Sequence, residues 1–191
     1  WNTKQEIQMN SLQYYLDTFE VSVPQLEKVA ATALSHGGDY ADLYFEYTTF
    51  FNLMLKDGIV SAGGFHTDYG VGIRVLKGEK TGYAYSENTD MPDMLKAAEA
   101  ASAIALGADA RQAYSRVIDR KTDCYPDTEN WRKHEADEFL PFIQNLEKAI
   151  FAKDSRIVKV IIRLSNSVSD VMMFNSLGEL TTDSRPMGSI T

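Results

Sequence analysis

The sequence predicts an α+β fold, in which mixed or antiparallel sheets are packed with helices. Several stretches alternate apolar and polar residues with the period of two that is typical of strands, and glycine-containing turns separate them. Amphipathic stretches with helical spacing precede them. The second half also echoes the first, each half reading as helix, strand, strand, tight glycine turn and strand. An internal duplication of a helix–strand–hairpin unit and a chance similarity both remain open.

Two helices are expected before the first strand. The amphipathic stretch 7–19 predicts one of them. The other begins near Ser22, because the sequence SVPQ places serine at the cap, proline in the first turn and Gln25 three residues after the cap. Gly37 and Gly38 are expected to end this helix.

The strands of the first half follow. The stretch ADLYFEYT predicts a strand, and FNLMLKDGIVSAGG predicts a hairpin whose Asp57-Gly58 pair is typical of a type I′ turn. A further strand is expected in GVGIRVL, followed by a turn in KGEKTG and a return in YAYS. The alternation of residues in the GVGIRVL strand predicts that its side chains point to two faces. One face holds Val71, Ile73 and Val75, and the other holds Gly70, Gly72, Arg74 and Leu76.

Asp90 is expected to cap the next helix. Residues 107–136 show no clear period and predict a connector. A helix is expected over 138–153, with a core stripe of Phe142, Ile143, Leu146, Ala149 and Ile150. The strand IVKVIIRL follows, then a hairpin that turns at 175–178. The final RPMGSIT reads as part of another strand with an unpaired edge, which suggests a piece of a longer protein.

This pattern divides the chain into three parts. Residues 1–110 are expected to form an N-terminal α/β domain, 111–136 a connector, and 137–191 the truncated start of a second α/β domain.

The composition excludes several classes of protein. The formal charge of −8 disfavours non-specific nucleic-acid binding, which depends on Lys and Arg. Cys124 is the single cysteine, so an internal disulfide and a cysteine-rich metal site are excluded. No apolar run approaches the roughly 20 residues that span a bilayer, and no signal-peptide pattern is visible. We expect a cytoplasmic protein without membrane contact.

Two motifs invite comparison with known sites. GEKTG lacks the glycine spacing and the following helix of a phosphate-binding loop, so a plain hairpin is favoured. HEADE begins like the His-Glu-x-x-His of zinc peptidases, but Glu138 holds the second histidine's position. His36 and His66 lie in turn-like contexts. A charged helix entry at His134 is favoured over a metal site, and no self-contained active site is predicted.

Arg74 is the residue of most interest, since it lies on the strand face that also carries two glycines. One interpretation is an ion pair with a nearby carboxylate such as Asp68 or Glu46. The other is contact with a peptide or a partner chain. In this second interpretation the candidate contact residues are Arg74, Gly70, Gly72 and Lys80.

The sequence also resembles a known family. DYADLYFE, LKDGIV and GVGIRVLKGEKTGYAYS resemble the N-terminal region of the TldD/PmbA family, also called modulators of DNA gyrase, and point to its TldD branch. DSRIVKV and GELTTDSRPM resemble the family's second domain. The likeness spans residues 24–187, and the connector matches poorly.

The resemblance implies a zinc metallopeptidase that acts on short or unfolded peptides. It implies as partners the chain's own C-terminal domain and either a second copy or a PmbA-like (TldE) subunit. The family's His-Glu-x-x-x-His segment is absent from this chain, and in HEADEF the sixth position is Phe139. We therefore expect no catalytic residue and no cofactor in this segment, and zinc in the full-length protein.

Two functions follow from this. The first is a scaffold, a wall of the substrate chamber and a subunit interface of a TldD-like metallopeptidase, inactive alone. The alternative is a non-catalytic interaction module that regulates a partner such as DNA gyrase. A His-Glu-x-x-x-His downstream in the coding sequence would decide for the first.

Overall fold

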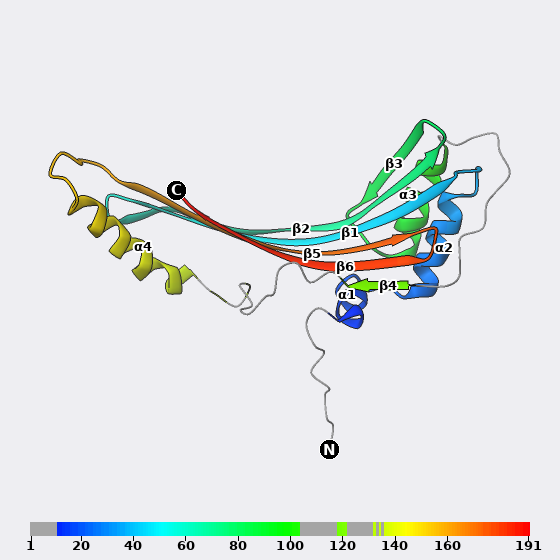
Figure 1. The fold of residues 1–191 in the computed structure, drawn as a ribbon, viewed down its shortest axis with the longest axis horizontal. Coiled ribbons are helices and arrows are strands. Elements are labelled where there is room, and N and C mark those ends of the chain that lie inside the picture. Colours follow the sequence, from blue (N-terminus) through cyan, green and yellow to red (C-terminus); the bar gives the residue numbers. More distant parts are fainter. Residues whose placement is uncertain (1–10, 104–117, 122–131, 133, 135) are drawn as a thin grey trace, which may run out of the picture. The chain divides into compact units, whose positions relative to one another are not determined.

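The computed structural model describes residues 11–103, 118–121, 132, 134 and 136–191 (Figure 1). Cys124 and most of the expected connector lie outside the described residues. The helices are α1 (Leu12–Thr18), α2 (Val23–Ala33), α3 (Met91–Ser102) and α4 (Ala136–Phe151). The strands are β1 (Tyr40–Lys56), β2 (Ile59–Lys77), β3 (Lys80–Ser86), β4 (Ile118–Lys121), β5 (Ile161–Asn175) and β6 (Glu179–Ile190).

The strands form one sheet in the order β3-β2-β1-β5-β6-β4. β2 and β3 pair antiparallel, while the short β4 pairs parallel to β6. At the far end of the β5–β6 hairpin, the backbone N–H groups of Arg163 and Thr191 each donate to the other residue's carbonyl, at 2.8 and 2.9 Å. The expected α+β class is confirmed.

The predicted turns are present at the expected residues. Asp57 and Gly58 have φ values of 52° and 77°, as the two central residues of a type I′ turn require. Gly78 and Gly178 also have positive φ, in the β2–β3 and β5–β6 turns. These local signals located the hairpins correctly.

The prediction of separate short strands was wrong. β1, β2 and β5 are single strands of 17, 19 and 15 residues. Thr48-Thr49 and Gly63-Gly64 interrupt the apolar alternation, and this suggested strand ends. Threonine is a good strand former, and pairing with neighbouring strands keeps the backbone extended through such breaks. RPMGSI is accordingly the end of β6 and pairs with β5.

The helix starts agree with the capping signals. The backbone N–H of Ser22 donates to Oε1 of Gln25 at 2.8 Å, and the Asp90 carboxylate accepts from the N–H of Asp93 at 2.9 Å. α2 ends at Ala33, earlier than the expected Gly37. α1 covers the second part of the stretch predicted as the first helix, whose beginning lies outside the described residues.

The chain divides into two compact units, each assembled from separate segments. Unit 1 contains 1–47, 69–124 and 170–183, and unit 2 contains 48–68, 125–169 and 184–191. The expected division at 110 and 136 stays a prediction, because most of residues 104–135 lie outside the described part.

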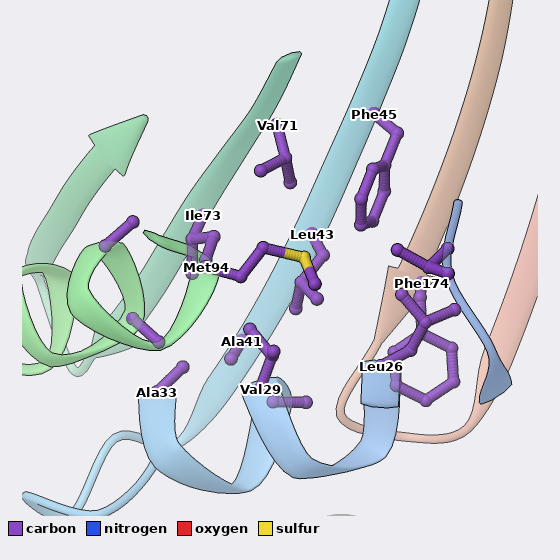
Figure 2. Close-up of a cluster of buried hydrophobic side chains, with 14 of the residues drawn as sticks. Leu26, Val29, Ala33, Ala41, Leu43, Phe45, Val71, Ile73, Met94 and Phe174 are labelled. Atoms are coloured by element: carbon purple, nitrogen blue, oxygen red, sulfur yellow. The ribbon is translucent and has the colours of Figure 1, made fainter. Parts of the chain in front are cut away.

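In unit 1, one face of the sheet is covered by helices. Figure 2 shows Leu26, Val29 and Ala33 of α2 together with Met94 of α3 against strand residues of this core. The expected buried face of β2 is confirmed, because Val71, Ile73 and Val75 are 0–3% exposed. The other strand residues of the core shown in Figure 2 are Ala41, Leu43, Phe45 and Phe174.

In unit 2, α4 packs on Leu53 and Leu55 of β1 and on residues of β5. The predicted stripe on α4 was partly wrong. Phe142 is 54% exposed, whereas Phe139 and Leu140 pack against the core. The buried side of the helix also includes Glu147, which is 6% exposed and accepts a hydrogen bond from the Gly58 N–H at 2.8 Å. The sequence prediction considered only apolar residues for the buried side of this helix, so it could not include a glutamate.

Among the described residues, none of the helices is long and apolar enough to cross a membrane.

Candidate interaction surface on strands β2 and β3

The candidate contact residues lie on the β2–β3 hairpin of unit 1. In its register Gly72 lies opposite Tyr85, Arg74 opposite Tyr83, and Lys77 opposite Lys80. Residues directly opposite in an antiparallel pair project to the same face. Arg74, Tyr83 and Tyr85 therefore share the face of the hairpin that is turned away from the buried Val71, Ile73 and Val75.

Arg74 pairs with Asp42, which lies on the neighbouring strand β1. Its Nε and one terminal guanidinium nitrogen donate to the same Asp42 Oδ2, at 3.0 and 2.5 Å. Asp42 is 4% exposed, while half of the Arg74 side chain is open to solvent. The hydrogen bond to Asp42 raises the pKa of Arg74 further. The ion-pair interpretation holds, but the carboxylate is neither Asp68 nor Glu46.

Two of the candidate glycines have structural reasons for lacking a side chain. A Cβ on Gly70 would lie 2.5 Å from the backbone oxygen of Ser86, so the two strands approach closely there. A Cβ on Gly72 would lie 2.7 Å from the Tyr83 hydroxyl oxygen and 3.1 Å from a ring carbon. Gly72 thus leaves room for the Tyr83 ring to lie across β2, as aromatic residues often do over strand glycines.

Tyr83 and Tyr85 are the residues that the sequence reasoning missed. They are 66% and 71% exposed, although tyrosine rings usually bury much of their surface. Their i, i+2 spacing in YAYS placed them on one face, but nothing local showed that the helices of the described residues leave this face uncovered. Exposed tyrosines beside an arginine have the composition of protein interaction surfaces.

Lys80 begins β3 and is exposed. It follows the Gly78-Glu79 turn, where the Gly78 N–H donates to Oδ2 of Asp39 at 2.9 Å. Lys77, directly opposite, donates to the Gly37 carbonyl. The structure therefore places Lys80 at the turn end of the same hairpin, beyond the Arg74–Tyr83 pair.

Tyr40 belongs to the same polar region. Burial and the Asp42 carboxylate raise its pKa above the ordinary value of 10.0. Both effects disfavour the phenolate, so Tyr40 keeps its proton in the folded protein at any pH near neutrality.

The histidines do not assemble a metal site. His134 Nδ1 lies 2.6 Å from Oε2 of Glu138, and His66 stacks on Phe50 with ring centroids 4.4 Å apart. His36 Nδ1 lies 2.8 Å from the Ser102 Oγ. Within the part of the chain that is described, no three His, Cys, Asp or Glu side chains are grouped to hold an ion. These residues do not fit a zinc centre, and no step of a reaction is assigned to them.

Comparisons with known proteins agree with this arrangement. Residues 41–105 match the family model described as PmbA/TldA metallopeptidase domain 1, and residues 129–191 match the PmbA/TldA metallopeptidase central domain. The chain belongs to the TldD/PmbA family. A TldD metalloprotease homologue of Haemophilus influenzae is 34% identical over 155 residues, which cover 78% of this chain and 31% of that protein. The chain thus spans about a third of the curated relatives that it matches.

Solved structures named as candidate modulators of DNA gyrase or as TldE share the fold. A candidate modulator of a DNA gyrase from Thermotoga maritima matches with a TM-score of 0.67 at 21% identity, over 87% of this chain and 38% of that one. TldE from Thermococcus kodakarensis matches with a TM-score of 0.65 at 13% identity, over the same shares. At these identities the likeness supports the fold alone.

Proposed function

We propose that this chain forms the scaffold, a wall of the substrate chamber and a subunit interface of a TldD-like metallopeptidase that acts on short or unfolded peptides. The observation that carries the proposal is the match to domain 1 and to the central domain, in that order, by a chain about a third as long as its TldD relatives. The zinc and its ligands belong to the remainder of the full-length cytoplasmic protein.

The exposed hairpin face supports a contact role for this segment. Arg74, Tyr83 and Tyr85 lie together on β2 and β3, and Arg74 offers the solvent-exposed part of its guanidinium group beside the two rings. Such a surface fits a peptide or the surface of a partner subunit, by aromatic contact and by hydrogen bonds to carbonyl groups. Gly70 and Gly72 shape this surface, and Lys80 borders it.

The partner in this proposal is a PmbA-like (TldE) subunit or a second copy of the chain. In support, TldE from Thermococcus kodakarensis has the same fold as this chain.

The test uses the longest natural polypeptide that contains this chain, purified with and without its TldE-like partner. Arg74→Ala and Tyr83→Ala should each lower peptide hydrolysis or the affinity of the two subunits about tenfold, the loss typical of an interface anchor. Lys28→Ala, at an exposed position of α2, is the matched control and should change neither. If hydrolysis and assembly are unchanged in both variants, Arg74 and Tyr83 are structural.

The alternative is a non-catalytic regulator of a partner such as DNA gyrase. In support, structures named as candidate modulators of DNA gyrase share the fold, although identities of 21% and 12% extend no function to this chain. The purified chain should leave the supercoiling rate of gyrase unchanged if the peptidase proposal is right. Saturable inhibition by the chain would favour the regulator.

A further inference from the structure

Unit 2 carries a concentration of positive charge at one end. This end holds the β1–β2 turn, the last turns of α4 and the connection from α4 to β5 (Figure 1), and the Gly58–Glu147 hydrogen bond joins the turn to the helix. The basic side chains of these segments are all exposed and belong to Lys56, Lys148, Lys153, Arg156, Lys159 and Arg163. The acidic residues of the same segments are Asp57, Glu147 and Asp154. This end is therefore basic, although the whole chain has a formal charge of −8.

Several of these cations have no anionic partner. Asp154 is occupied by Arg156, whose Nε and one terminal guanidinium nitrogen lie 2.6–3.1 Å from its carboxylate oxygens. Among the residues that the structure describes, no carboxylate pairs with Lys56, Lys159 or Arg163. Exposed cations that gather at one place without partners create a local field that attracts an anion.

Lys56 and Arg163 project to the face of the sheet that α4 leaves uncovered. Their neighbours along the strands, Leu55 and Ile162, are buried in the core beneath α4. Successive side chains of a strand point to opposite faces, so the two cations point away from that core. Lys159, just before β5, is likewise exposed beside a buried residue.

The pairing of β1 with β5 brings these cations to the same end of the sheet. The two strands are neighbours in the sheet. The Ser176 N–H donates to the Ala41 carbonyl at 2.8 Å, and further along β1 the Thr48 Oγ1 lies 2.6 Å from the Ser169 Oγ. The contacts move forward along β1 and backward along β5, so the strands run antiparallel. The last residues of β1 therefore lie beside the first residues of β5.

A hollow of about 240 Å³ continues from this end across unit 2. Ser165 lines it and is two residues beyond Arg163 on β5, so the two side chains share a face. The Ser165 Oγ lies 2.8 Å from the Oγ of Ser189, which also lines the hollow, as does Asn52 of β1. Hydroxyl and amide groups of this kind can hydrogen-bond to the main chain of a peptide.

We propose that this face of unit 2, with its cations and its hollow, binds acidic segments of peptides. The hollow receives the main chain, and Lys56, Lys159 and Arg163 receive the carboxylates, which arginine can hold through two parallel N–H···O bonds. We call it the basic face. The inference deepens the proposed function by naming acidic peptides as the preferred substrates, and it rests on that function only for the step from binding to hydrolysis.

Two exposed aliphatic side chains favour a peptide over a nucleic acid as the anion. Val158 is 88% exposed between Arg156 and Lys159, and Ile161 is 36% exposed between Lys159 and Arg163. Apolar side chains of a peptide can pack on them, whereas a phosphate backbone gains nothing from such a contact. The formal charge of −8 also repels a long polyanion more than a short acidic segment.

Binding of labelled probes to the purified 191-residue chain tests the basic face directly. The probes are a short fluorescein-labelled peptide of Glu, Leu and Ser, its counterpart with Gln in place of every Glu, and a single-stranded DNA oligonucleotide of the same charge. In fluorescence anisotropy, the Glu peptide should bind about tenfold more tightly than either of the other two. Added salt should weaken this binding, because it screens exposed charges.

Variants with matched charge locate the site. Lys56→Gln with Arg163→Gln should raise the Kd for the Glu peptide about tenfold. Lys28→Gln with Lys96→Gln, at exposed positions of α2 and α3, removes the same charge from unit 1 and should change this Kd little. Lys56→Glu with Arg163→Glu should abolish binding of the Glu peptide and create affinity for a counterpart that carries Lys. Circular dichroism confirms that each variant is folded.

The results that would overturn the inference are specific. They are equal affinities for the Glu and Gln peptides, tighter binding of the DNA, or an equal loss of affinity in the Lys28→Gln, Lys96→Gln control. In the longest natural polypeptide that contains this chain, Lys56→Gln with Arg163→Gln should raise the KM for a Glu-containing peptide about tenfold at nearly unchanged kcat. A polypeptide that binds the Glu peptide through the basic face but hydrolyses no peptide would contradict the proposed function while supporting this inference.

Discussion

The backbone N–H of Gly58 donates a hydrogen bond to Oε1 of Glu147 at 2.8 Å, so a buried carboxylate of α4 holds the tip of the β1–β2 hairpin. Glu147→Ala should lower the free energy of unfolding by about 1–3 kcal/mol, because it removes a charge-assisted hydrogen bond and packing. Glu147→Gln keeps a hydrogen-bond acceptor and should lower the free energy of unfolding less than Glu147→Ala does. Urea unfolding measures both, with Lys148→Ala at an exposed position as control. Equal stability of Glu147→Ala and Lys148→Ala would contradict this role.

Gly70 and Gly72 should respond differently to the same substitution. Gly70→Ala places a Cβ against a backbone oxygen of the neighbouring strand. It should lower the free energy of unfolding by about 2 kcal/mol or more. Gly72→Ala meets the exposed end of the Tyr83 side chain, which can rotate away, and should cost about 1 kcal/mol or less. In the background of Tyr83→Ala, the cost of Gly72→Ala should fall further. Chemical denaturation of the four variants measures these losses in the free energy of unfolding. A larger loss for Gly72→Ala than for Gly70→Ala would contradict the prediction.

The Arg74–Asp42 pair should show measurable coupling. Arg74→Ala leaves the Asp42 carboxylate buried without this guanidinium, while the exposed half of Arg74 is screened by water. We expect a loss of about 1–2 kcal/mol in the free energy of unfolding. A double-mutant cycle with Arg74→Ala and Asp42→Asn isolates the pair, and strictly additive losses would show that it contributes nothing.

Tyr40 should make the protein less stable at high pH. Because burial and Asp42 raise its pKa in the folded state, the unfolded chain loses this proton first as the pH rises. The stabilisation is complete below the ordinary value of 10.0 and is lost as the pH rises through the higher folded-state pKa. The free energy of unfolding, measured between about pH 9 and pH 11, should fall less steeply in Tyr40→Phe than in the wild type. Identical slopes would exclude the effect.

Local sequence signals predicted the features that depend on neighbouring residues. The Asp57-Gly58 turn, the buried face of Val71, Ile73 and Val75, and the caps at Ser22 and Asp90 are all present. Each depends on a backbone conformation or a side-chain period that spans a few residues, and such information is readable without the rest of the chain.

The missed features depend on contacts between residues far apart in the sequence. Asp42 could be recognised as the Arg74 partner only once β1 and β2 were paired. The exposure of Tyr83 and Tyr85 follows from which face of the sheet the helices cover, which no single strand reveals. Glu147 joined the buried side of α4 because the hairpin tip supplies an N–H, whereas Phe142 lies on the exposed side of the helix.

The central claim is that this chain supplies scaffold and contact surfaces while the hydrolytic metal site lies elsewhere in the full-length protein. The most direct measurement incubates the purified 191-residue chain with zinc and an unfolded peptide, follows cleavage with and without a chelator, and measures bound zinc by elemental analysis. The account predicts no chelator-sensitive cleavage and no tightly bound stoichiometric zinc. Chelator-sensitive cleavage by this chain, or one zinc retained per chain, would contradict it.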